Sequence, residues 1–294
     1  MKNKIIGIGE VVWDCLPNGR KLGGAPLNFA YFALQCGADS YAVSAVGHDE
    51  LGRETLEAIA KSGVDLSYIQ VNELPTSRVL VTVDAEGIPQ YEILKDVAWD
   101  AIRCSSAETD LMKDASAVCW GSLAQRSALS RESVLSMVKA APGSCLKVFD
   151  INIRQHYYDR ETIEASLEYA DVLKLNEDEL PVVCSLFGIT GSSVLEQMDE
   201  LIRRFSLKHV VYTCGSACSE VYGAEGLLSH IDTPQVKVAD TVGAGDSFTA
   251  VFISSLLGGR TLAQAHELAV KVSAFVCTKE GAINPLPESL LSDL

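Results

Sequence analysis

Short apolar runs rich in β-branched residues alternate with helical patterns along most of this chain of 294 residues. Most of the runs lack alternating polar positions, which is typical of strands covered on both faces of a parallel sheet. Because neighbouring parallel strands need a crossover, the alternation predicts right-handed βαβ units. We therefore expect an α/β fold with a doubly wound, mainly parallel sheet flanked by helices. The expected strands are 5–8, 41–46, 117–120, 146–151, 172–175 and 209–213, and the expected helices are 27–36, 50–61, 131–141, 161–169, 177–186 and 194–205.

Two segments interrupt this alternation. Residues 77–83 and 90–94 are extended runs joined by a turn that contains Gly87 and Pro89, which predicts a hairpin outside the parallel array. Residues 13–24 form a second irregular stretch, rich in glycine and proline. Since no Pro/Ser-rich linker divides the chain, we expect one domain over residues 1–294, with a small β lid formed by about 11–24 and 75–97.

The charge balance limits the class of partner. The chain has 39 acidic and 24 basic side chains and a formal net charge of −15. Nucleic acids and anionic membranes require a basic face, so we expect neither as a partner. No apolar run reaches the length of a membrane span, and the N-terminus does not resemble a signal peptide. These features predict a cytoplasmic protein.

The nine cysteines are dispersed and odd in number, which favours free thiols in a reducing compartment over disulfides. Cys214 and Cys218 lie four residues apart, but no neighbouring His or Cys in the sequence completes a zinc set. We therefore expect no zinc site from them.

A glycine-rich turn precedes a carboxylate and an apolar helical run, in the segment Asp240-Thr241-Val242-Gly243-Ala244-Gly245-Asp246. Small residues let backbone N–H groups surround an anion, and a helix that follows directs its positive end at the same place. This pattern predicts a phosphoryl-transfer site in which Asp246 faces the acceptor hydroxyl. Because the helix dipole favours the ionised carboxylate, we expect Asp246 to be a weak base.

A second group of polar residues follows the first expected strand. Asp14 comes soon after that strand, and Gly24 and Asn28 stand at the start of the next helix. A carboxylate, an amide and exposed backbone amides match the several hydroxyls of a sugar. The alternative is local, with Asp14 in a turn and Asn28 as a helix cap.

Three further segments carry polar groups at strand ends. Asp150, Asn152 and Arg154 alternate at the end of an apolar run, so they are expected on one face of a strand that extends to Arg154, with Arg154 facing an anionic group. Asn176 and Glu179 fit either a capping box or water-mediated binding of Mg²⁺. A further strand closes at 213–215, where it could border a nucleotide base.

These motifs, in this order, resemble the ribokinase-like (PfkB) family of carbohydrate kinases over essentially the whole chain. The motifs that carry the resemblance are 23–28, 46–52, Asn176-x-x-Glu179 and, most specifically, 240–246. The start of the chain and the 150–154 segment are most similar to the fructokinase branch. The nucleotide strand departs from the family pattern, because Cys218 stands where relatives have glycine.

The resemblance implies ATP-dependent phosphorylation of the primary hydroxyl of a small sugar, most simply fructose to fructose 6-phosphate. It also implies Mg²⁺, a monovalent cation such as K⁺ at Asp240, and a homodimer formed through the lid. The roles implied are Asp246 as catalytic base, the amides of Gly243, Ala244 and Gly245 as anion hole, Asp14, Gly24, Asn28 and Arg154 as sugar-binding residues, Asn176 and Glu179 for Mg²⁺ and phosphate, and Thr213, Gly215 and Gly281 for the nucleotide.

Other acceptors and one other class of function stay open. An acidic sugar such as 2-keto-3-deoxygluconate would need cations, for which Lys21, Arg78 and Lys95 are candidates. Ribose is another alternative. A nucleoside would need aromatic stacking, for which Tyr91, Trp99 and Trp13 are candidates. The other class is a non-catalytic sugar-binding regulator on the same fold.

Overall fold

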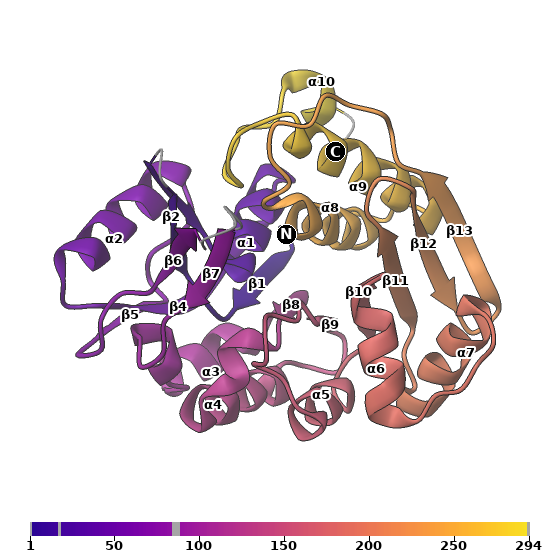
Figure 1. Cartoon of the computed structure of the whole chain (residues 1–294), viewed down its shortest axis with the longest axis horizontal. Coiled ribbons are helices and arrows are strands. Elements are labelled where there is room, and N and C mark those ends of the chain that lie inside the picture. Colours follow the sequence, from indigo (N-terminus) through magenta and orange to yellow (C-terminus); the bar gives the residue numbers. More distant parts are fainter. Residues whose placement is uncertain (1, 17–18, 84–88, 293–294) are drawn as a thin grey trace.

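The computed structural model describes residues 2–16, 19–83 and 89–292. Within these residues the main sheet has the strand order β13-β12-β11-β10-β9-β8-β1-β4-β5 (Figure 1). All neighbours from β11 to β5 pair in parallel, whereas β12 and β13 extend the sheet as antiparallel strands. The strands are β1 (Lys4–Ile8), β4 (Asp39–Gly47), β5 (Ile69–Asn72), β8 (Ala117–Trp120), β9 (Leu146–Asp150), β10 (Val172–Asn176), β11 (His209–Cys214), β12 (Cys218–Gly223) and β13 (Gly226–Asp232).

Helices cover both faces of this sheet, as a doubly wound fold requires. The alternation of side chains along β1 places Ile5 in one buried cluster and Ile6 in the other. The Ile5 face is covered by α1 (Ala25–Gln35), α2 (Glu50–Ser62), α8 (Ala244–Leu257) and α9 (Leu262–Cys277). The Ile6 face is covered by α3 (Ser106–Met112), α4 (Ala128–Ala140), α5 (Arg160–Leu167), α6 (Glu179–Phe187) and α7 (Val194–Phe205) (Figure 1).

A second, four-stranded sheet lies beside the main one. It contains β2 (Val12–Leu16), β3 (Gly19–Gly23), β6 (Arg78–Val83) and β7 (Pro89–Ile93) in the order β3-β2-β6-β7. The stretch expected to be irregular thus forms a hairpin, β2–β3, and β2 pairs in parallel with β6. This is the predicted small β lid. Trp13 anchors it, because Trp13 Nε1 donates to Thr55 Oγ1 at 2.8 Å on α2.

The six expected strands and six expected helices are all present, with ends shifted by up to three residues. Three strands of the main sheet were not expected: β5, β12 and β13. The last two mix polar and apolar residues, so they do not show the continuous apolar pattern of buried parallel strands. No helix within the described residues is long and apolar enough to cross a membrane.

Candidate active site

The polar residues expected to act together converge at one edge of the main sheet. Strands β9, β10 and β11 run parallel and end there at Asp150, Asn176 and Cys214. The carboxyl ends of parallel strands are the usual place of ligand crevices in such sheets. Helix α8 begins beside them, because Gly245 at its start lies against a β10 side chain.

The turn before α8 depends on glycine at position 243. Gly243 has φ +80°, and a Cβ placed on it would lie 2.6 Å from the Cβ of Ala282. Both the left-handed backbone and the close approach exclude a larger residue without a shift of the turn. Gly243 therefore fixes where the N-terminus of α8 points.

Two of the three predicted anion-hole amides are available. Neither Gly243 N–H nor Gly245 N–H donates to a backbone carbonyl in the part of the chain that the structure describes. Ala244 N–H instead donates to the Thr241 carbonyl at 3.2 Å, so this amide is engaged within the turn. The first N–H groups of a helix lack intrahelical partners, so those of Gly243 and Gly245 suit an anion.

Asp246 stands in the first turn of α8, where Asn28 Nδ2 donates to its Oδ2 at 2.7 Å. Burial and the charge of Asp150 raise the pKa of Asp246 to about 6, although Asn28, Lys174 and Arg154 oppose the shift. The expectation of a weak base was therefore wrong. Burial outweighs the helix dipole, which contributes up to about 2 kcal/mol in partly buried geometries.

Asn28 also shows that the site is built for a polar ligand. Asn28 is 2% exposed, and its Oδ1 has no hydrogen-bond partner among the described residues. Glu10 is 4% exposed, and its Oε2 likewise lacks a described partner. Burial, with a contribution from the Asp246 charge, raises the pKa of Glu10 to about 7. Buried acceptors without partners are rare in folded proteins, and a ligand with several hydroxyls would satisfy them.

Gly24 links β3 to α1 and packs against the turn after β1. It has φ +117°, and a Cβ there would lie 2.3 Å from the Glu10 carbonyl oxygen. Only glycine allows this approach, so Gly24 sets the position of Asn28 one turn further along α1.

Asp14 brings the lid into the same site. It lies on β2 opposite Lys21 of β3 and is partly exposed. Burial and the charge of Asp240 raise its pKa, while Arg154 and Lys21 lower it. The charge of Asp240, in the turn before α8, and that of Arg154, after β9, therefore both act on the lid carboxylate Asp14.

Lys174 is a buried cation at the centre of the site. It is 8% exposed, and its Nζ lies 3.1 Å from Asp150 Oδ1. Thr249 Oγ1 of α8 donates to the other oxygen of Asp150 at 3.0 Å. A Cβ placed on Gly245 would lie 3.0 Å from Lys174 Nζ, so the ammonium sits directly against the first turn of α8.

Asn176 and Glu179 cap α6 reciprocally. Asn176 N–H donates to Glu179 Oε2, and the N–H groups of Asp178 and Glu179 donate to Asn176 Oδ1, all at 2.9 Å. Ile153 N–H donates to Glu179 Oε1 at 2.8 Å. The capping-box interpretation is thus confirmed. The same carboxylate and amide oxygens fit Mg²⁺, which prefers hard oxygen donors and retains several waters.

Thr213 and Gly215 lie next to this group. Thr213 pairs with Asn176 in the β10–β11 register, and Glu177 N–H donates to the Thr213 carbonyl at 3.0 Å. Gly215 has φ +46° in the turn that follows, and a Cβ there would lie 3.1 Å from Glu177 Oε1. Both residues therefore lie beside the Asn176–Glu179 segment.

Comparison with known proteins gives the family of this chain. Residues 9–289 match the family described as pfkB family carbohydrate kinase. The chain belongs to this family. It is 30% identical over 310 residues to a fructokinase of Klebsiella pneumoniae, covering 98% of this chain and 97% of the relative. It is 28% identical over 308 residues to an ATP-dependent 6-phosphofructokinase of Thermoanaerobacterium thermosaccharolyticum, covering 98% and 92%.

The fold comparison gives the same result. The crystal structure of a fructokinase with bound ATP from Xylella fastidiosa superposes with a TM-score of 0.86 at 20% identity, covering 100% of this chain and 98% of that one. The predicted doubly wound, ribokinase-like α/β fold of this carbohydrate kinase is therefore confirmed.

Sequence reasoning about this kinase missed Lys174. Burial would lower the pKa of its ammonium, but the charges of Asp150, Glu179 and Asp246 outweigh burial and raise it. One signal was present, because Lys174 interrupts the apolar run Val172–Asn176 that was interpreted as a strand buried on both faces. A lysine is rarely buried without a partner.

The interpretation of residues 150–154 of the kinase was partly wrong. Strand β9 ends at Asp150, and Asn152 has φ +45°, so the period-two alternation does not continue to Arg154. Arg154 is exposed, yet its charge lowers the pKa values of Glu10, Asp14 and Asp246. It therefore still faces the site, from a loop and not from a strand.

The expected monovalent cation at Asp240 stays a prediction; in the structure, hydrogen bonds within the protein hold this carboxylate. Its Oδ1 accepts from Val242 N–H at 3.1 Å, and its Oδ2 accepts from Gly281 N–H at 3.0 Å and from Lys21 Nζ at 3.2 Å. Burial would raise the pKa of Asp240, but these hydrogen bonds lower it. Asp240 thus ties the turn before α8 to Gly281 and to the lid.

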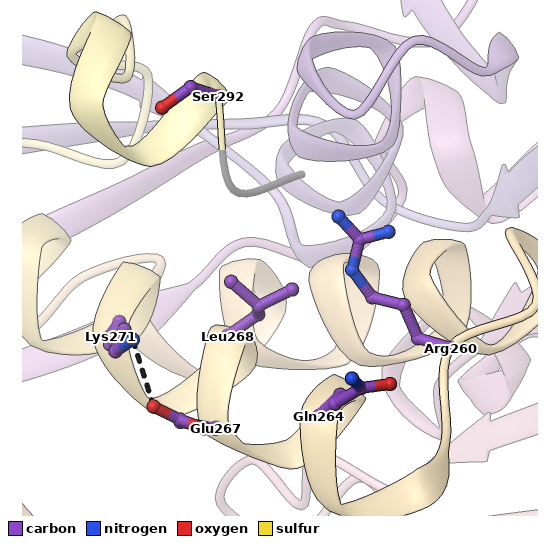
Figure 2. Close-up of a pocket in the computed structure, with 6 residues that line it drawn as sticks. All are labelled: Arg260, Gln264, Glu267, Leu268, Lys271 and Ser292. Carbon is purple, nitrogen blue, oxygen red and sulfur yellow. Dashed lines mark ion pairs between the residues drawn. The ribbon is translucent and has the colours of Figure 1, made fainter.

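A groove elsewhere on the kinase is separate from this site. It runs along α9 toward α10 (Glu288–Leu291) (Figure 2). Its lining is mostly polar, and Lys271 pairs with Glu267 within it at 2.9 Å. None of its lining residues belongs to the candidate active site.

Proposed function

We propose that this protein catalyses the ATP-dependent phosphorylation of the primary hydroxyl of a small neutral sugar, with fructose to fructose 6-phosphate as the favoured reaction. The observation that carries the proposal is the Asp246–Asn28 pair beside the amides of Gly243 and Gly245 and the Lys174 ammonium. The fructokinase relative at 30% identity supports fructose as the acceptor.

Phosphoryl transfer passes through a loose transition state, so positioning and charge neutralisation supply most of the catalysis. We assign the N–H groups of Gly243 and Gly245, together with Lys174, to the oxygens of the transferring phosphoryl group. Preorganised donors of this kind each lower a barrier by about 3 kcal/mol. Lys174 adds a full positive charge, held in place by Asp150 at 3.1 Å.

Asp246 would take the proton from the attacking hydroxyl as the new phosphorus–oxygen bond forms and the bond to the ADP oxygen breaks. A pKa of about 6 leaves this carboxylate mostly ionised at neutral pH and makes it a stronger base than an ordinary aspartate. Asn28 Nδ2 holds one carboxylate oxygen, so the other is free to accept the hydroxyl proton.

The remaining polar groups would bind the sugar. Asn28 Oδ1 and Glu10 Oε2 are buried acceptors in need of donors, and Asp14 is a further carboxylate on the lid strand β2. Each can accept from a sugar hydroxyl. Arg154 faces the same carboxylates and would donate to the sugar or to a phosphate oxygen.

For the nucleotide, Thr213, Gly215 and Gly281 would border ATP, while Asn176 and Glu179 would hold Mg²⁺ through water. Mg²⁺, when bound, neutralises the phosphate oxygens. Glu179 also orients the loop at Ile153, which carries Arg154.

Features of the lid favour a neutral sugar over the other acceptors. Lys21 is already paired with Asp240 and, at 3.6 Å, with Glu280, and Lys95 lies 5.6 Å from the ring centre of Tyr157. Trp99 is fully buried, so it is unable to stack on a nucleoside base. The side chain of Tyr91 lies outside the described part of the chain. Arg78 still leaves an acidic sugar open, and Trp13 still leaves a nucleoside open. These acceptors and ribose are therefore included in the experiment.

The proposal is tested by measuring ADP release from ATP and Mg²⁺ with a panel of acceptors: fructose, ribose, 2-keto-3-deoxygluconate and a nucleoside. We expect the highest kcat/KM with fructose and little ATP hydrolysis without an acceptor. A preference for another acceptor would change the proposed substrate but leave the proposed kinase activity intact. Sugar binding without turnover would support a non-catalytic regulator and contradict the proposal.

A further inference from the structure

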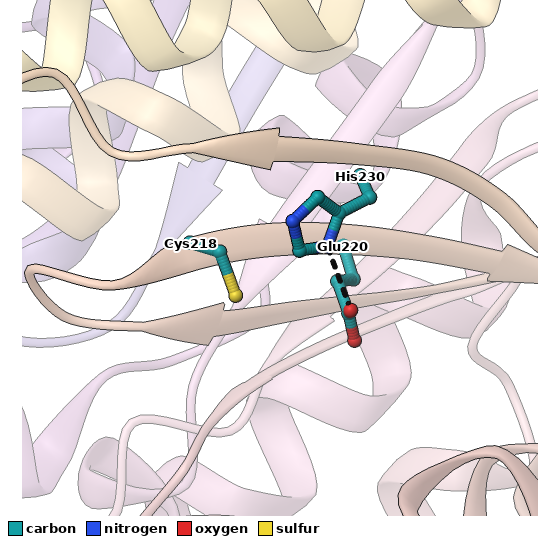
Figure 3. A group of neighbouring side chains, drawn as sticks. All are labelled: Cys218, Glu220 and His230. Carbon is teal, nitrogen blue, oxygen red and sulfur yellow. Dashed lines mark hydrogen bonds and ion pairs between the residues drawn. The ribbon is translucent and has the colours of Figure 1, made fainter.

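A group of soft and hard metal-binding side chains lies on the antiparallel edge of the main sheet, beside the strand end that carries Thr213 and Gly215 and apart from Asp246. Cys218 and Glu220 alternate along β12, so they share one face of the sheet, and His230 on β13 stands opposite Glu220. Their donor atoms lie within 4.8 Å of one another. Figure 3 shows the three side chains gathered over the β12–β13 hairpin.

We infer that Cys218, Glu220 and His230 form a binding site for a divalent transition metal of the zinc type. Thiolate, imidazole and carboxylate together are zinc ligands, whereas Mg²⁺ prefers oxygen donors alone. The reasoning from spacing in the sequence expected no zinc site, since His230 is twelve residues from Cys218. The β12–β13 register removes that separation.

The surrounding groups orient the proposed ligands as metal sites require. His230 Nδ1 lies 2.9 Å from Glu220 Oε1, and its Nε2 lies 3.4 Å from Asp232 Oδ1. A carboxylate on the second ring nitrogen is the usual partner of a metal-binding histidine. The Tyr222 hydroxyl donates to the other oxygen of Glu220. A metal at this place would replace the hydrogen bond between His230 and Glu220.

Charge and access also suit a cation. The carboxylates of Glu220 and Asp232 lie beside His230, and a divalent ion would neutralise their charge. Cys214 pairs with Cys218 in the β11–β12 register, so a second thiol lies on the neighbouring strand. The His230 side chain is 45% exposed, which leaves a path for entry.

The test measures binding of Zn²⁺ alone to the full chain, stripped with a chelator and kept reduced without added thiol. We expect one Zn²⁺ per chain, not displaced by an excess of Mg²⁺. Cys218→Ser and His230→Gln should each weaken binding at least as much as Asp232→Asn. Asp232 contacts His230 and is not itself a proposed ligand, so for Asp232→Asn we expect the Zn²⁺ affinity to fall by about 10–100-fold.

Matched controls and a second signal keep the result specific. Cys277→Ser and His48→Gln remove another partly exposed cysteine and an exposed histidine, and they should bind Zn²⁺ like the wild type. Co²⁺ should give a sulfur-to-metal charge-transfer band that Cys218→Ser abolishes, with circular dichroism showing that the variant is folded. Two results would overturn the inference. One is a Zn²⁺ affinity of the wild type that is no higher than that of the Cys218→Ser/His230→Gln double variant. The other is a charge-transfer band that survives in Cys218→Ser.

Discussion

Asp246 is the residue on which the proposed chemistry depends most directly. Its carboxylate combines a pKa near 6 with a hydrogen bond from Asn28 at 2.7 Å. Asp246→Asn keeps the shape and removes the base, so we expect kcat to fall by roughly 10²–10⁴-fold. Steady-state kinetics with the best acceptor measure this, with exposed Asp110→Asn as control. Near-wild-type turnover would remove Asp246 from the role of base.

Asp14 belongs to substrate binding on our proposal. Asp14→Ala should chiefly raise the sugar KM, because it removes an acceptor from the lid without touching the transferring phosphate. Arg20→Ala is the control, since it removes the lid's outer contact with Glu54 at 2.9 Å and its contact with the Trp13 ring. A sugar KM that Arg20→Ala raises as much as Asp14→Ala would show that Asp14 acts through lid position alone.

Lys174 has both a catalytic and a structural side, and two variants separate them. Lys174→Met leaves the Asp150 carboxylate buried without its cation, which typically costs 3–5 kcal/mol of stability. Adding Asp150→Asn should recover much of that loss, measured by urea unfolding. We expect kcat to stay about 10²–10³-fold low in both variants, because the positive charge is absent from each. Recovery of kcat in the double variant would make Lys174 purely structural.

At the scale of elements, the turn at the start of α8 is held in place by contacts from other parts of the fold. Gly281 N–H and Lys21 fix Asp240, and Asp240 in turn holds the Val242 N–H. Lys21 belongs to the lid strand β3, so lid and anion-binding turn share one carboxylate. The position of the turn is therefore coupled to that of the lid.

Two glycines with similar backbone angles test the importance of this turn. Gly243→Ala meets both a left-handed backbone and the Ala282 Cβ at 2.6 Å, so it should displace the start of α8. Gly259→Ala, past the end of the same helix, has φ +85° but no described atom within 4 Å of its Cβ. Both should lose about 1–3 kcal/mol of stability from backbone strain.

Only Gly243→Ala should also lower kcat and raise the ATP KM. The measurement is a full kinetic comparison at equal folded fraction. Equal kinetic effects of the two substitutions would mean that strain in α8, and not the position of its first amides, limits the reaction.

At the scale of the whole molecule, the buried carboxyls of the site reduce stability as they ionise. Glu10 has a pKa of about 7 in the folded protein and an ordinary value near 4.5 unfolded. Between these values the unfolded chain releases the proton while the folded one retains it, so stability falls as pH rises. Below about 4.5 and above about 7 the contribution is constant.

Glu10→Gln removes this dependence. The free energy of unfolding of the wild type, relative to Glu10→Gln, should fall by about 3 kcal/mol between pH 4.5 and 7. Urea unfolding at a series of pH values measures it. A difference that is flat across this range, or that rises, would show that Glu10 is not held protonated by the fold.

The lid also bears on assembly. Its sheet ends in β3 and β7, which pair with no further strand within the described residues. Edge strands of this kind can pair with another copy of the chain. The homodimer through the lid stays a prediction, to be checked by sedimentation.

Much of this architecture could be predicted from local patterns. Apolar runs such as 117–120 and 172–175 are buried strands, and Asn176 with Glu179 forms the reciprocal cap that its spacing indicates. The turn before α8 could also be predicted, because its left-handed backbone at position 243 favours glycine, and glycine is what the sequence has there. Information of this kind lies within a few residues of the chain, where propensity and spacing act directly.

What local patterns left undecided depends on residues brought together from afar. The pKa of Asp246 is set by burial and by Asp150, which lies 96 positions away in the chain, and not by the helix that carries it. Cys218 meets His230 only through the register of a hairpin at the sheet edge. Burial and long-range electrostatics exist only once the chain has folded, so the strength of the base, the place of Lys174 and the proposed metal site were decided by the tertiary structure.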